Sequence, residues 1–142
     1  MPYNPGIITL GIIGCGGVTE TFHLPSLKQL PNIEVASLSD VDKEKLDRAA
    51  ETFGIRNRYE DPYELIKREE IDAVAVCTPS GSHYALGKAV LDAGKHLFME
   101  KPVALSLHEN GQLIKKAGES SVRAFAGFNL RFHRNVSKAK EI

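Results

Sequence analysis

The chain has 142 residues, of which 42% are hydrophobic and 25% charged, and its 18 basic and 18 acidic side chains cancel. This length and composition are typical of one globular domain that buries its core without disulfide bonds or metal ions. The neutral balance argues against a nucleic-acid-binding surface, which needs a basic excess, and the apolar runs are far shorter than the ~18 residues of a membrane span.

The two cysteines and the first residues indicate the setting of the chain. Cys15 and Cys77 have no zinc-binding or redox-motif spacing, so no metal site is expected. Residues 1–5 lack the basic and apolar regions of a signal peptide. We therefore expect a protein of the reducing cytoplasm, in which both cysteines are packed thiols rather than a disulfide.

The first half of the chain alternates short apolar runs with segments of helical period. The first run is β-branched and flanked by glycines, as in a buried strand, and Asp61 followed by Pro62 is a favourable helix start. The predicted elements are, in chain order, a strand over residues 7–13, a helix over 18–30 ended by Pro31, a strand over 33–38, a helix over 42–53 ended by Gly54, a short strand over 57–59 and a helix from Asp61–Pro62.

The second half continues the alternation. A continuous apolar run over residues 73–77 again predicts an inner strand. It is followed by a helix over 82–92 with Ser82 as its cap and Gly94 after its end, a strand over 96–99, a helix over 106–117, a strand over 122–126 and a last helix from about Asn135.

Alternating strands and helices, with apolar rather than alternating strands, are typical of a parallel sheet covered by helices on both faces. The fold predicted for residues 1–142 is therefore a single α/β domain, a doubly wound parallel sheet of about six strands in the Rossmann order 3-2-1-4-5-6.

A glycine-rich turn directly follows the first predicted strand. The first glycine permits a tight turn, the second lets the backbone approach a pyrophosphate, and the following helix offers free N–H groups. An ordinary tight turn is the alternative, because a glycine cluster alone is a weak signal. The third fingerprint position, usually Gly or Ala, is Thr19, which either loosens the packing of helix against strand or is tolerated. The cofactor contacts predicted here are Gly14, Cys15, Gly16, Gly17 and Val18.

Asp40 ends the second predicted strand, 21 residues after Thr19. An acid about 20 residues after the glycine turn hydrogen-bonds the adenosine ribose in dinucleotide-binding folds, and it repels a 2′-phosphate. This favours NAD, while Lys43 and Arg48 nearby leave NADP possible. The alternative role for Asp40 is a cap of the helix that begins at Asp42.

A polar turn follows the predicted strand over residues 73–77, at the edge where ligands bind in this fold. Its hydroxyl groups would lie beside a nicotinamide ribose or the pyrophosphate. The alternative is a proline-containing turn that caps the next helix through Ser82, and His83 suits a substrate contact and a packing role equally. The predicted contacts are Thr78, Pro79, Ser80 and His83.

Glu100, Lys101 and Pro102 follow the predicted strand over residues 96–99. By themselves they are typical of a solvated ion pair in a loop. Together with the glycine turn, Thr78-Pro79 with His83 downstream, and the run Gly127-Phe128-Asn129-Leu130-Arg131-Phe132, the sequence resembles the glucose–fructose oxidoreductase and inositol dehydrogenase family (Gfo/Idh/MocA) over residues 7–142.

The resemblance implies roles for several of these residues. Glu100 would contact the nicotinamide ribose, and Lys101, the expected catalytic residue, would orient the substrate hydroxyl or relay its proton. A lysine suits this position because its charge polarises the alcohol oxygen. Pro102, often preceded by a cis bond in this family, would direct Lys101, and Arg131 would lie near the nicotinamide carboxamide or the substrate.

The resemblance also implies a function for a longer protein. That parent would be a homo-oligomeric NAD(P)-dependent oxidoreductase that acts on a hydroxyl carbon of a sugar, inositol or related polyol, with no nucleic-acid or membrane partner. We expect the chain to be truncated near the connection to an absent substrate domain, because residues 138–142 are helical sequence without a cap. The chain alone would bind cofactor without turnover. The alternative is a stand-alone nucleotide-binding sensor or docking module.

Overall fold

The computed structural model describes residues 6–141, so the expectations for residues 1–5 and 142 lie outside the described part. Its centre is a six-stranded sheet in the order β3-β2-β1-β4-β5-β6, in which every neighbouring pair is parallel. The predicted α/β class and strand order are confirmed. The strands are β1 (Ile8–Ile13), β2 (Ile33–Ser39), β3 (Asn57–Tyr59), β4 (Ala73–Val76), β5 (His96–Met99) and β6 (Ala124–Ala126).

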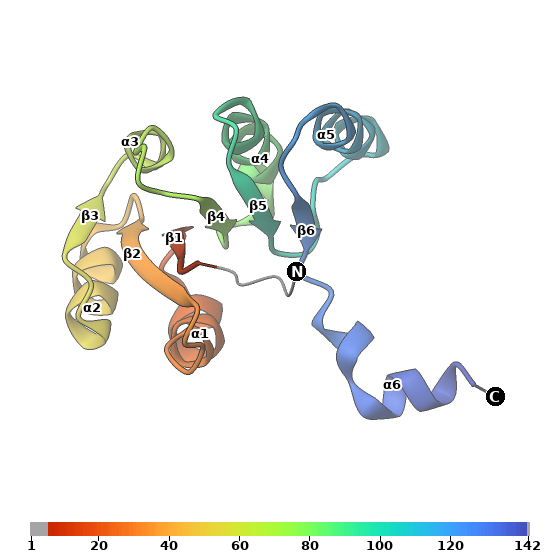
Figure 1. Ribbon diagram of the computed structural model, residues 1–142, viewed down its shortest axis with the longest axis horizontal. Coiled ribbons are helices and arrows are strands. Elements are labelled where there is room, and N and C mark those ends of the chain that lie inside the picture. Colours follow the sequence, from red (N-terminus) through yellow and green to blue (C-terminus); the bar gives the residue numbers. More distant parts are fainter. Residues whose placement is uncertain (1–5, 142) are drawn as a thin grey trace.

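Helices connect the strands and cover both faces of the sheet (Figure 1). α1 and α2 lie on one face, and α3, α4 and α5 lie on the other. The helical elements are η1 (Thr19–His23), α1 (Leu24–Leu27), α2 (Lys43–Phe53), α3 (Pro62–Ile66), η2 (Ser80–Ser82), α4 (His83–Asp92), α5 (Leu107–Glu119), η3 (Asn129–Phe132) and α6 (Arg134–Ala139).

The apolar core has two parts, one on each face of the sheet, as a doubly wound fold requires. Leu24 and Leu46 belong to the cluster beneath α1 and α2, together with Ile12 of β1. Leu65 and Val90 belong to the cluster beneath α3, α4 and α5. The central strands are buried from both sides at their carboxyl ends, and β4 is apolar along its whole length.

The strand register brings the functional loops to one edge of the sheet. Ile13 at the end of β1 pairs with Ser39 of β2 and with Val76 of β4, and Val76 pairs with Met99 of β5. The segments that begin at Gly14, Asp40, Cys77 and Glu100 therefore leave the sheet at neighbouring points, the carboxyl edge where doubly wound folds bind ligands.

The first helix differs from the prediction of a regular helix over residues 18–30. It begins with the π-helical turn η1, in which the Leu24 amide donates to the Thr19 carbonyl, and passes into the four-residue α1. Pro25 explains the difference, because it has no amide proton to donate and its ring crowds the preceding turn. The helix also ends earlier than expected, at Leu27.

The predicted cap of α4 is wrong. Ser82 has helical backbone angles, and within the described chain its side chain makes no capping hydrogen bond. Its hydroxyl instead donates to the Pro79 carbonyl and pairs with the Thr78 hydroxyl at 2.7 Å. A serine side chain bonds local backbone in turns as readily as at helix starts, so sequence did not separate the two roles.

Other helix ends agree with the sequence. Asp42, Asp61 and Ser106 each accept hydrogen bonds from the first backbone amides of α2, α3 and α5. Gly54 ends α2 with φ +70°. α6 extends away from the sheet (Figure 1), and within the described chain none of its residues is buried. Among residues 6–141, no helix is long and apolar enough to cross a membrane.

Candidate functional site

A groove of about 460 Å³ lies at the carboxyl edge of the sheet, where the loops after β1, β2 and β4 meet. It brings together five of the predicted contact residues, Gly14, Gly16, Asp40, Thr78 and Pro79. Its wall also contains residues that the sequence did not single out, among them Ser39, Val41, Lys45 and Tyr63.

Gly14 makes the closest approach between the loops of this groove. A Cβ atom at Gly14 would lie 2.6 Å from the carbonyl carbon and oxygen of Cys77, and its φ of +101° is rare for other residues. The Gly14 amide donates to the Ser39 carbonyl at 2.7 Å. At Gly16, by contrast, no described atom other than those of Gly16 and its two chain neighbours lies within 4 Å of a Cβ position. The turn is therefore tight at its base and open above.

Thr19 replaces the small third residue of the glycine fingerprint without loosening the turn. Its side chain is fully buried, and its hydroxyl donates to the Gly14 carbonyl at 2.7 Å. This bond joins the first helical turn to the base of the loop. In the usual fingerprint, a small third residue lets the helix pack closely against the strand. Here the hydrogen bond from the Thr19 hydroxyl holds the helix close to the loop.

Asp40 organises the loop through backbone hydrogen bonds. One carboxylate oxygen accepts from the Cys15 amide at 2.7 Å, and the other accepts from the Asp42 amide at 2.8 Å. Asp42, not Asp40, caps α2 by accepting from the Glu44 and Lys45 amides. Asp40 is half-buried on the groove wall. Each of its oxygens keeps a further lone pair for a hydroxyl group of a ligand.

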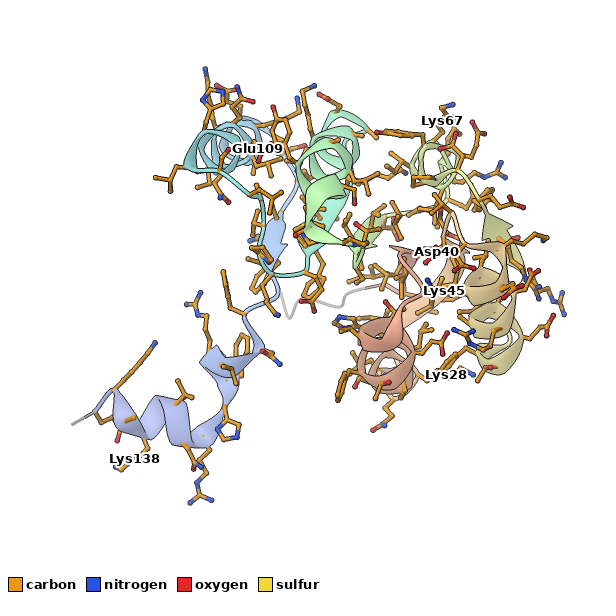
Figure 2. All side chains as sticks on the ribbon, turned by 180° about the vertical axis from the view of Figure 1, so that it is seen from behind. Lys28, Asp40, Lys45, Lys67, Glu109 and Lys138 are labelled. Atoms are coloured by element: carbon orange, nitrogen blue, oxygen red, sulfur yellow. The ribbon has the colours of Figure 1, made fainter. Side chains whose placement is uncertain are left out.

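Lys45 extends from α2 to the same wall, and Figure 2 shows it beside Asp40. Its ammonium lies 2.9 Å from an Asp42 carboxylate oxygen. A hydrogen bond from Lys45 lowers the pKa of the Asp42 carboxyl, and that bond and the Asp42 charge raise the pKa of Lys45. The wall near Asp40 therefore carries an ion pair as well as the apolar side chains of Val41 and Tyr63.

The loop after β4 is held by its own side chains. The Thr78 and Ser82 hydroxyls lie 2.7 Å apart, and Ser82 donates to the Pro79 carbonyl. Thr78 and Pro79 line the groove, and Ser80 begins η2 immediately beyond it. His83 does not line the groove, because its ring is buried beneath this loop, with 1% of the residue exposed.

Glu100 is joined to the first helix of the chain, a contact that the sequence did not predict. Its Oε1 lies 2.9 Å from Nε2 of His23, and its Oε2 accepts from the Lys101 amide at 3.0 Å. The His23 ring packs edge-on against Phe98, with ring centres 5.6 Å apart. His23 is separated from Glu100 by 77 positions, and no sequence spacing marks such a pair.

Lys101 and Arg131 lie outside the groove. Lys101 is exposed, and the Lys101–Pro102 peptide bond is cis. Lys101 and Pro102 border a second, larger cavity of about 700 Å³ that α5 and β6 line with apolar side chains. Arg131 is exposed in η3, beyond β6. The polar side chains on the wall of the larger cavity are Lys101 and Asn110. The smaller groove contains Asp40, Thr78 and the glycine turn, and it lies at the carboxyl edge where doubly wound folds bind ligands, so it is the better candidate for a cofactor.

The residues of the groove suit a dinucleotide. Open space above Gly16 and the amides of the first helical turn suit a pyrophosphate. The Ser39 hydroxyl is buried on the groove wall without a hydrogen-bond partner in the described chain. Within residues 6–141, no group of three or more His, Cys, Asp or Glu side chains is arranged to hold a metal ion.

The two cysteines at this edge are free thiols. Burial, followed by the nearby Asp40 carboxylate, raises the pKa of Cys15 to about 12, and burial raises the pKa of Cys77 to about 12. The Cys15 amide is used by Asp40, so this residue supports the loop rather than offering its amide to a ligand. Neutral, buried thiols are poor nucleophiles and pack as small apolar groups.

Together, the parallel sheet, the glycine turn and the acid at the end of β2 define a dinucleotide-binding Rossmann domain. Residues 8–128 match the family described as "Oxidoreductase family, NAD-binding Rossmann fold", the Gfo/Idh/MocA family. The chain belongs to this family, which confirms the resemblance found in the sequence.

Relatives of known identity include dehydrogenases of inositols. The chain is 38% identical over 132 residues to the myo-inositol 2-dehydrogenase of Thermotoga maritima, an alignment that covers 93% of this chain and 39% of that enzyme. The scyllo-inositol dehydrogenase of Lactobacillus casei, solved with NAD(H) and scyllo-inositol, has a TM-score of 0.88 and 27% identity, over 95% of this chain and 40% of that chain.

A 3-ketoreductase from Actinomadura kijaniata, solved with NADP, is similar to the same extent. Its TM-score is 0.88 at 27% identity, and the match covers 96% of this chain and 43% of that one. The chain therefore spans about two fifths of the length of these relatives. Solved neighbours hold NAD(H) in one case and NADP in another, so the fold serves both cofactors.

Proposed function

We propose that the chain is the cofactor-binding part of an oxidoreductase that uses NAD in preference to NADP and acts on a hydroxyl carbon of a sugar, inositol or related polyol. The observation that carries the proposal is the groove itself, with Asp40 at its β2 end and the Glu100–Lys101 turn after β5, the strand that pairs with β4. The named activities of the inositol dehydrogenase relatives support the substrate class.

The groove gives the cofactor a direction. The pyrophosphate lies over Gly14 and Gly16, and the adenosine ribose lies on Asp40, whose charge disfavours a 2′-phosphate. Val41 and Tyr63 give an apolar wall that suits an adenine ring. Thr78 then continues the path from β4 towards β5. Lys45, which lines the same wall, is why NADP remains possible as the weaker ligand.

Lys101 is the proposed catalytic residue. When bound, a nicotinamide accepts or supplies the hydride. Lys101 is exposed and follows β5, where its ammonium group is free to orient a substrate hydroxyl and to take part in moving its proton. Glu100 holds the Lys101 amide and bonds His23, so it fixes the backbone from which Lys101 extends.

We propose that turnover needs a second domain, in addition to the part of the relatives that this chain matches. The surface around Lys101 is open, and its neighbours in the larger cavity are mostly apolar. Hydride transfer needs a substrate held in near-attack geometry, which an open surface does not provide. The same proposal includes a parent enzyme that is a homo-oligomer.

Two measurements on the chain test this function. With NAD and myo-inositol or scyllo-inositol, the chain should form no NADH above background, and sustained turnover would overturn the need for a second domain. The variant Lys101→Ala should bind NADH within about twofold of the wild type, because Lys101 acts on substrate. Lys115→Ala, which removes an exposed lysine from α5, is the matched control. A selective loss of NADH binding in Lys101→Ala would place this lysine on the cofactor instead.

A further inference from the structure

His83 is a buried polar side chain that the proposed function does not use. It is the first residue of α4, immediately after the loop that carries Thr78. The residue is 1% exposed, and its ring lies beneath the groove rather than on the groove wall. A buried imidazole needs hydrogen-bond partners, and the identity of those partners indicates what the ring does.

Both ring nitrogens of His83 face backbone carbonyl oxygens. Nε2 lies 2.7 Å from the Thr78 oxygen, and Nδ1 lies 2.6 Å from the Pro102 oxygen. A carbonyl oxygen accepts and never donates, so the ring donates from each nitrogen that carries a proton. The imidazole is rigid, and it therefore sets the separation of the two carbonyl groups that it touches.

The two carbonyl groups belong to the two loops that carry the proposed site. Thr78 begins the loop after β4, and it lines the groove. Pro102 directly follows Lys101 in the loop after β5. On the other side of Lys101, Glu100 accepts from the Lys101 amide and contacts His23. Lys101 thus lies between two neighbours that are each held in place. His83 holds Pro102, the neighbour on the side of the Thr78 loop.

We propose that His83 is a positioning residue that ties the Lys101–Pro102 turn to the Thr78 loop, and so holds Glu100 and Lys101 beside the nicotinamide half of a cofactor bound in the groove. The proposal rests on the proposed function of the groove. It also replaces the expectation that His83 touches the cofactor or the substrate. The adenosine half, held by Gly14, Gly16 and Asp40, does not depend on this tie.

The test compares NADH with ADP, which has the adenosine half and no nicotinamide riboside. In His83→Leu, the affinity for ADP should stay within about twofold of the wild type. The affinity for NADH should fall about tenfold, because Glu100, the contact expected for the nicotinamide ribose, is no longer held in place. His83→Gln, which restores a donor to one of the carbonyls, should recover part of the preference for NADH.

Lys95→Met is the matched control. Lys95 is also buried, and its ammonium donates to the Arg68 and Ile71 carbonyls at 2.6 Å each, but it precedes β5 at the opposite edge of the sheet. Its loss should lower stability without changing the ratio of NADH to ADP affinity. A merely structural role for His83 would give the same result, and the proposal would then fail.

The remaining outcomes are also decisive. An unchanged ratio in either folded His83 variant would overturn the proposal, as would a wild-type chain that binds NADH no more tightly than ADP. If both His83 variants fail to fold while Lys95→Met folds, His83 is structural and the proposal is again overturned. A wild-type chain that binds neither ligand would instead contradict the proposed function of the groove.

Discussion

At the scale of single residues, Asp40 shows how one side chain connects fold and function. Its two carboxylate oxygens hold the Cys15 and Asp42 amides, so it fixes the glycine loop against the start of α2. The same oxygens face the groove that we assign to the adenosine ribose. The conformation of the glycine loop and the proposed preference for NAD therefore depend on the same carboxylate.

Asp40→Ala should weaken NADH binding about tenfold, because the ribose loses a charged acceptor. NADPH should lose less, since the repulsion of its 2′-phosphate is removed at the same time. Calorimetric titration of both cofactors checks the difference. Asp47→Ala, which removes an acid from the outer surface of α2, is the charge-matched control. Equal losses for both cofactors in Asp40→Ala would count against the ribose assignment.

The buried thiols predict how stability depends on pH. The pKa of Cys15 and of Cys77 is raised to about 12 in the folded chain, whereas an unfolded thiol ionises near about 8.5. Between these values the unfolded chain binds fewer protons, so the free energy of unfolding falls as the pH rises. The stabilisation is fully present below about pH 8.5 and is lost on approach to pH 12.

Urea unfolding of the wild type and of a variant without the two thiols, at pH 7.5 and pH 10, measures this loss. The other side chains titrate equally in both proteins, so the difference between them reports the thiols. The double variant Cys15→Ala and Cys77→Ala should lose less stability over this interval than the wild type. Identical losses in the two proteins would show that the thiols are not protected by burial.

The positions of several site residues were predictable from the sequence because these residues belong to local patterns. The glycines after β1 and the acid after β2 follow strands at fixed spacing, and the structure places Gly14, Gly16 and Asp40 in one groove. The pair of His23 with Glu100 was not predictable, because it depends on how η1 packs against β5. The burial of His83 was likewise not visible in its sequence neighbours.

At the scale of elements, the glycine turn combines a constrained base with an open top. Gly14 lies against the Cys77 backbone at positive φ, whereas Gly16 faces open space. The helix that follows has a π-turn before Pro25, and Thr19 ties that turn to the Gly14 carbonyl. Capping residues predicted the starts of α2, α3 and α5, but the π-turn required knowledge of which carbonyl the chain could reach.

The two glycines should respond to alanine in opposite ways. Gly14→Ala should lower the free energy of unfolding by at least about 1–3 kcal/mol, the cost of an unfavourable φ before the clash with Cys77 is added. Gly16→Ala should change stability by less than about 0.5 kcal/mol but weaken NADH binding, because its methyl group occupies the approach of the pyrophosphate. Urea unfolding and NADH titration of both variants separate the effects. Wild-type NADH affinity in Gly16→Ala would move the pyrophosphate elsewhere.

At the scale of the whole molecule, the parallel sheet places every proposed cofactor contact at one edge, the carboxyl edge. The strand order was predictable because apolar strands alternate with helices, and such chains have few ways to wind a parallel sheet. The cavity between α5 and β6 was not predicted, because it arises from how those elements pack rather than from any local motif.

The central claim is that the groove at this edge binds NAD in preference to NADP, and calorimetric titration of the chain with NADH and NADPH tests it most directly. We predict saturable binding at one site, with NADH bound about tenfold more tightly, the effect of one well-placed charged hydrogen bond. Tighter binding of NADPH would contradict the role given to Asp40. Saturable binding of neither cofactor would contradict the function of the groove itself.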